Sequence, residues 1–238
     1  MIRECKKAAW QELKSKRIIL YSAVYFIFTA IFNEVTDMLI GTLSTPSSAV
    51  SDVVYTVLTN CIIFPFSLGY MHTIISPEPK PDGFFTFFAP KHLKFILLTL
   101  LLLIIPYNVF NYFKYHFAAD GRTTMELLSS TISLFFSYLV AIFKVLHSQT
   151  TYFKAIFPEN SFFENIVQTI KFIFGHFVKF ILFNLTFLLW KLAQTMIAYI
   201  FLMKFDLEIV STILQMVILA VYSPYYVLSL KRFVNSCE

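Results

Sequence analysis

Six long apolar runs constrain this chain more than any other feature. They cover approximately residues 18–40, 53–75, 95–117, 126–152, 177–203 and 207–231 of a 238-residue chain. A helix that crosses the ~30 Å hydrocarbon core of a bilayer needs about 20 mostly apolar residues. Only 14% of the residues are charged, whereas soluble domains carry about 25%. The sequence therefore predicts an all-α membrane protein, a single polytopic domain over 1–238 with six transmembrane helices.

The loops between these runs alternate in positive charge. Lysine and arginine concentrate before the first run, in the 76–94 and 154–179 loops and in the tail, whereas the 41–52 loop has neither. Cytoplasmic loops carry the excess of Lys and Arg, so we expect a multi-pass protein of the cytoplasmic (inner) membrane with both termini inside. The basic N-terminus could also begin a signal peptide, but the 18–40 run is too long for one and contains Asn33, Glu34 and Asp37.

Two segments outside the runs have an amphipathic pattern. Residues 2–16 place apolar side chains at helical spacing, next to Trp10 and several lysines. In residues 161–175, Ser161 and Glu164 have the spacing of a capping box, which starts a helix. Its predicted apolar side carries Phe162, Phe163, Ile166, Val167, Ile170 and Phe174, and its polar side Asn165, Gln168 and Lys171. We expect both helices to lie in the membrane surface; an ordinary cytoplasmic loop helix is the alternative for the second.

A short sequence pattern recurs along the chain. A basic residue followed by an apolar run opens at Lys16, Lys94 and Lys179, at intervals of about 80 residues. This spacing is consistent with three parallel pseudo-repeats of an interfacial helix and a transmembrane hairpin. The alternative is that basic-then-apolar phrases occur at any cytoplasmic boundary.

Several short motifs between residues 60 and 230 match a known pattern. They are Leu68-Gly69-Tyr70, Gly83-Phe84, Ser161-Phe162-Phe163-Glu164-Asn165-Ile166, Gly175-His176-Phe177, Lys179-Phe180, Asn184-Leu185-Thr186-Phe187, Trp190 and Pro224-Tyr225-Tyr226. In these motifs the chain resembles a bacterial integral-membrane family, domain of unknown function nine-seventy-five. A departure lies at Phe157-Pro158-Glu159-Asn160, where the family pattern has Asn-Pro. The resemblance implies a multi-helix membrane protein of bacterial origin and implies no reaction.

No catalytic or metal-binding motif occurs in the sequence. There is no Gly-x-Ser-x-Gly, no His-Glu-x-x-His and no Cys-x-x-Cys, and no two of the five histidines have metal-ligand spacing on one helix. The net charge of +5 comes from residues that flank the apolar runs, which indicates topology rather than nucleic-acid binding. We therefore expect a protein that is not an enzyme and has no cofactor.

Polar residues inside the predicted spans are the candidate site residues, because an ionisable group at the bilayer centre costs ~2.5–3.5 kcal/mol or more. Lys191 is central in its run, with Asn184 and Thr195 on the same predicted face. At ~1.5 Å per residue its depth matches that of Glu34 or Asp37, so an ion pair inside the bundle is predicted. Lys144 lies nearer the cytoplasmic end of the 126–152 run, and His147 near it is a further candidate. This run carries a second polar stripe at steps of three, four or seven residues: Ser130, Ser133, Ser137, Lys144, Ser148 and Thr151. Both stripes fit either interhelical packing or a cavity for a substrate or lipid.

These observations favour a non-enzymatic protein with a membrane-embedded partner. The partner classes that we expect are membrane lipids, a hydrophobic peptide or another membrane protein, in an accessory or immunity-type role. The alternative is a small-substrate membrane transporter, which the possible repeats and the polar stripes would favour.

Overall fold

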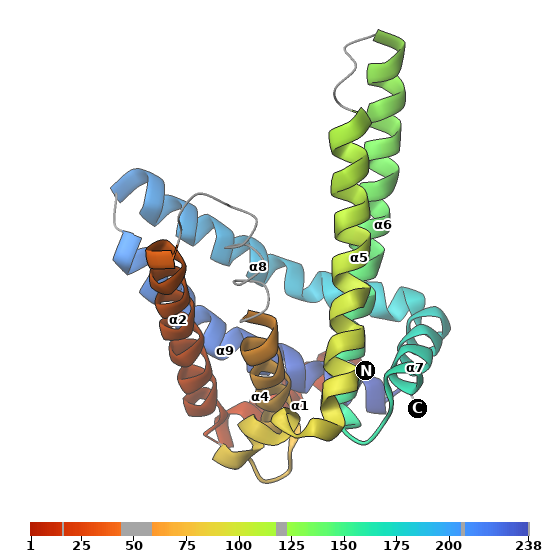
Figure 1. The fold of residues 1–238 in the computed structure, drawn as a ribbon. Helices are drawn as coiled ribbons and strands as arrows, with labels where there is room; N and C mark the ends of the chain where they lie inside the picture. The colour runs from red at the N-terminus through yellow and green to blue at the C-terminus, as the bar shows by residue number, and fades with distance from the viewer. Residues whose placement is uncertain (16, 44–58, 118–122, 206–207, 238) are drawn as a thin grey trace. The chain divides into compact units, whose positions relative to one another are not determined.

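The computed structural model describes residues 1–15, 17–43, 59–117, 123–205 and 208–237, and these are all-helical, without a strand (Figure 1). The predicted all-α fold class is therefore confirmed over this part of the chain. The α-helices are α1 (Ile2–Ser15), α2 (Ile18–Leu43), α4 (Phe64–Ile75), α5 (Leu93–Phe117), α6 (Thr123–Ile156), α7 (Phe162–Gly175), α8 (Phe177–Phe205) and α9 (Glu208–Asn235). A π-helical turn, η1 (Thr59–Ile63), precedes α4, and two 3-10 helices, η2 (Pro81–Phe88) and η3 (Pro90–His92), precede α5.

Three to four of the described helices are long and apolar enough to cross a membrane. Three are Ile18–Met38, Phe177–Ile197 and Thr212–Asn235, and a fourth candidate would join Pro81–Phe88 with Pro90–Leu102. Helices also occur at the predicted runs 95–117 and 126–152. The second run is described only from residue 59, because 44–58 lie outside the described residues. Six spans and the pseudo-repeats stay predictions.

The chain divides into two compact units, which are described separately. One comprises Met1–Phe88 with Phe172–Glu238, and the other comprises Ala89–Lys171.

In the first unit, helix α1 packs against α9 and α2. Cys5, Ala9 and Leu13 are spaced four residues apart, lie on one face of α1 and are buried. This confirms the amphipathic helix predicted for residues 2–16, except that residue 16 is outside the described part. The chain turns from α1 into α2 at Arg17, whose φ of 54° lies in the left-handed region.

The 3-10 helix η2 packs on α4, and glycine makes the contact possible. A Cβ atom on Gly69 would collide with the backbone carbonyl of Phe84. With 3.0 residues per turn, Phe84 and Phe87 fall on one side of η2, and both are buried. Tyr70 on α4 is also buried in this core. Its hydroxyl donates to Ser22 Oγ on α2 at 2.9 Å.

In the second unit, α5 and α6 form a hairpin and lie side by side (Figure 1). The predicted capping box begins α7: the Ser161 amide donates to Glu164 Oε2 at 2.6 Å, and the Glu164 amide donates to Ser161 Oγ at 3.3 Å. This confirms the predicted helix start.

Helix α7 shows an exposed apolar side, formed by Phe163, Val167, Ile170 and Phe174. Its predicted polar side is only partly as expected: Lys171 is exposed, but Asn165 is fully buried. The Asn165 amide donates to the carbonyls of Asn160 and Ser161 at 3.3 and 2.9 Å. The Asn165 side chain therefore stabilises the start of α7, its own helix.

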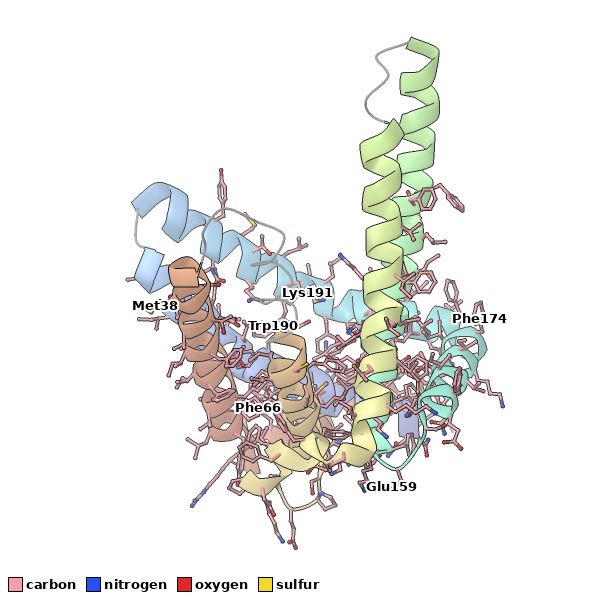
Figure 2. All side chains as sticks on the ribbon, in the orientation of Figure 1. Met38, Phe66, Glu159, Phe174, Trp190 and Lys191 are labelled. Atoms are coloured by element: carbon pink, nitrogen blue, oxygen red, sulfur yellow. The ribbon has the colours of Figure 1, made fainter. Side chains whose placement is uncertain are left out.

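Large apolar side chains are exposed on two candidate spans and on α7. Met38 on α2 is 70% exposed, Trp190 on α8 is 47% exposed, and Phe174 on α7 is 78% exposed (Figure 2). Water-soluble proteins rarely expose so many contiguous apolar residues, so this surface is consistent with contact to lipid.

Candidate functional site

The first unit contains an open groove of ≈ 720 Å³ between α1, α8 and α9. Its size falls in the range of ligand-binding sites, roughly 300–1,000 Å³. Among the described residues, no acidic side chain lines it. The lining residues are Ile2, Arg3, Lys6, Lys7, Trp10, Leu182, Thr186 and Tyr225.

The basic side of the groove comes from the first two turns of α1. Residues three and four apart are neighbours on a helix surface, so Arg3, Lys6, Lys7 and Trp10 share one face. This face adjoins the buried stripe of Cys5, Ala9 and Leu13, which packs into the unit. Burial of that stripe therefore fixes the rotation of α1 and turns its cations toward the groove.

Lys6, which lines the groove, places its ammonium over two aromatic rings. The Lys6 ammonium lies 4.3 Å from the centroid of the Phe187 ring and 6.0 Å from that of Tyr225. It also donates to the Thr186 carbonyl at 3.3 Å. Burial lowers the pKa of the Lys6 ammonium.

The aromatic wall joins α1 to α9. The rings of Trp10 and Tyr225 meet edge-to-face with centroids 5.6 Å apart. Trp10 is 40% exposed, so part of its indole faces the groove. Tryptophan and tyrosine favour the membrane–water boundary, where one end of the ring is apolar and the other is wet.

A second polar cluster lies in the second unit, around a pocket of ≈ 340 Å³ at the start of α5, the end of α6 and the start of α7. Lys154 is buried there, and its ammonium donates to the carbonyls of Pro158 at 2.5 Å and Asn160 at 2.6 Å. Burial lowers the pKa of Lys154. The Lys91 ammonium pairs with Glu159 at 3.0 Å. These interactions tie the α6–α7 connection in place, so the cluster has a structural role.

The predicted ion pair of Lys191 with Glu34 or Asp37 is absent, so this prediction was wrong. All three side chains are exposed, and Lys191 lies on α8 (Figure 2). Burial along α8 ends at Phe187, which is 1% exposed. From Leu188 to Ile200 every described side chain is exposed or half-buried. Equal depth along two helices does not bring their side chains together. Whether another helix packs against that part of α8 depends on the tertiary structure.

The other predicted site residues of α8 do not form a stripe with Lys191. The Asn184 side chain is tied down, since Nδ2 donates to the Phe180 carbonyl and Oδ1 accepts from the Tyr226 hydroxyl, each at 2.9 Å. Thr195 is exposed, and its hydroxyl donates to the Lys191 carbonyl at 3.0 Å. Asn184 thus joins α8 to α9, as the packing interpretation expects.

Much of the polar stripe predicted on α6 is exposed on the surface. Ser137 and Lys144 are exposed, and His147 is half-buried. Thr151, the last residue of the predicted stripe, is buried at the end of this helix together with Gln149 and Thr150.

Sequence reasoning missed the groove itself. It identified α1 as amphipathic but assigned its cations to topology alone. The local signal was Trp10, which follows Arg3, Lys6 and Lys7 closely in the sequence. This signal did not reveal which span would face these side chains. Thr186 and Tyr225 come from distant segments that α8 and α9 bring together.

Among the described residues, no group of three or more His, Cys, Asp or Glu could hold a metal ion. Comparisons with protein-family models, curated proteins and solved structures find no match for this chain. The resemblance to the nine-seventy-five family therefore stays a prediction.

Proposed function

We propose that this chain is a non-enzymatic membrane protein that binds a lipid in the groove between α1, α8 and α9. The protein would be a multi-pass component of the cytoplasmic membrane, with both termini inside. The observation that carries the proposal is the groove's composition: cations, amphipathic rings and apolar side chains line one continuous site.

The two parts of a lipid fit the two parts of the groove. Leu182, 50% exposed on α8, offers an apolar surface to acyl chains. Basic residues on an amphipathic helix favour the headgroup level of a membrane. A small water-soluble solute would gain little from the apolar surface, and an acyl chain alone would gain little from the basic residues.

The small number of lining residues also favours lipid over a protein partner. A stable protein interface takes roughly 20–30 residues from each side, whereas eight described residues line this groove. A headgroup with the first carbons of its acyl chains is of the right scale.

Photocrosslinking tests the proposal. The protein is reconstituted in vesicles with a phospholipid that carries a diazirine near the top of one acyl chain, and the adducts are located by mass spectrometry. We expect adducts at Ile2 and Leu182 in excess of their exposed area, relative to Leu189, which is 74% exposed on the same helix α8.

A groove-filling variant, Thr186→Trp, should reduce the adducts at Ile2 and leave those at Leu189 unchanged. Adducts that simply follow exposed area, and that Thr186→Trp does not alter, would mean that the groove is ordinary lipid-facing surface.

A further inference from the structure

The basic side of the groove is unbalanced in charge. Arg3, Lys6 and Lys7 lie within five consecutive positions of α1 and line the groove together, and none of the other lining residues in the described part of the chain is acidic. Like charges three or four residues apart on a helix repel each other. An anion between them would relieve this repulsion.

Two of the three cations are available to a ligand. Lys6 already makes a cation–π contact with the Phe187 ring and donates a hydrogen bond to the Thr186 carbonyl. Arg3 and Lys7 are exposed and, among the described residues, take part in no ion pair. Arginine matches phosphate oxygens with its planar fork, and lysine adds a point charge.

We propose that the groove selects a phospholipid with a net negative headgroup, whose phosphate lies between Arg3 and Lys7. This rests on the proposed lipid-binding function and adds the class of lipid. A zwitterionic headgroup brings an ammonium that the three cations repel, whereas an anionic headgroup brings none. Trp10 lies beside the expected phosphate position and reports on the occupant.

The two tryptophans of the chain provide an internal control. In a Trp190→Phe variant, fluorescence comes from Trp10 in the groove. In a Trp10→Phe variant, it comes from Trp190, which is exposed on α8 outside the groove. Each variant is reconstituted in phosphatidylcholine vesicles that contain a minor fraction of brominated phosphatidylglycerol, or of brominated phosphatidylcholine. Bromine quenches only a nearby indole.

We expect Trp10 to be quenched by brominated phosphatidylglycerol with a preference of roughly tenfold over brominated phosphatidylcholine, whereas Trp190 shows no preference. Arg3→Gln with Lys7→Gln should abolish the preference. Lys171→Gln with Lys179→Gln removes the same charge from exposed sites outside the groove and should retain it. Equal Trp10 emission and thermal unfolding in phosphatidylcholine vesicles show that the variants are folded.

The outcomes separate this inference from the function on which it rests. Equal quenching of Trp10 by both lipids would overturn headgroup selection and leave lipid binding in place. The same preference for brominated phosphatidylglycerol at Trp190 would also overturn headgroup selection by the groove. So would a preference at Trp10 that survives Arg3→Gln with Lys7→Gln. In either case the whole protein surface, and not the groove, would attract the anionic lipid. No quenching of Trp10 by either lipid would overturn both proposals.

Discussion

The ammonium of Lys231 on α9 donates a hydrogen bond to the carbonyl oxygen of Ile75, the last residue of α4, at 2.6 Å. The last carbonyls of a helix have no partner within it, and a cation there also complements the helix dipole. Lys231 therefore joins the C-terminal helix to α4, across 156 positions of sequence.

Replacing Lys231 with methionine should destabilise the fold by about 1–2 kcal/mol, since a charged hydrogen bond at a helix end is lost. Lys231→Arg retains a donor and should lose less. Thermal unfolding of the purified protein in detergent measures both variants. Equal stability of Lys231→Met and the unchanged protein would contradict the contact.

A methyl group at Gly69 should disrupt the packing of η2 on α4. Gly69→Ala places a Cβ atom against the Phe84 carbonyl, and overpacking of this kind costs about 1–3 kcal/mol. Gly175→Ala is the matched control, because nothing lies within 4 Å of its added Cβ. Thermal unfolding should show a loss for the first variant only; a loss of the same size in both would argue against the tight contact.

Thiol labelling tests the predicted topology. Cys5 is buried and Cys61 is exposed, so a Cys61→Ala variant leaves Cys237 as the reporter. A membrane-impermeant maleimide should label Cys237 only after cells are permeabilised. Labelling from outside would contradict a cytoplasmic C-terminus.

The rate of Cys237 labelling should depend on pH in a defined direction. Burial raises the pKa of the Cys237 thiol, and only the thiolate reacts. Near neutral pH the folded protein should therefore react more slowly than the unfolded chain, and the difference should shrink as the pH rises toward the pKa of the folded state. A folded protein that reacts faster at pH 7 would contradict the assigned environment.

The start of α7 should loosen in acid. The Ser161 backbone amide lowers the pKa of the Glu164 carboxyl. Because the folded-state pKa is depressed, the contribution of this cap is complete above the ordinary glutamate pKa and is lost as the pH falls through the folded-state value. Hydrogen exchange of the Ser161 amide should report this loss, once corrected for intrinsic rates. Loss of protection already at neutral pH would be inconsistent with the capping box.

The exposed position of Lys191 predicts that it is not coupled to Glu34. Lys191→Met and Glu34→Gln should have additive effects on stability, with a coupling energy near zero in a double-mutant cycle. A stabilising interaction of about 1 kcal/mol or more would restore the ion pair that the sequence suggested.

The local features of this protein follow from its sequence. Long apolar runs became helices because a helix satisfies its own backbone hydrogen bonds without water. The capping box formed because Ser161 and Glu164 are three residues apart and need no distant partner. The buried stripe of α1 followed in the same way from helical spacing. Such features depend on neighbours in the chain, so sequence suffices.

Contacts between distant segments were decided by the tertiary structure. Lys191 and Phe187 are one helical turn apart, yet Phe187 is buried against α9 and Lys191 is exposed. Lys6 faces the Phe187 ring, although nothing near either residue predicts the other. Sequence periodicity fixes which residues share a face of a helix. Which partner covers that face, and how far along the helix the cover extends, depends on the packing of the helices in three dimensions.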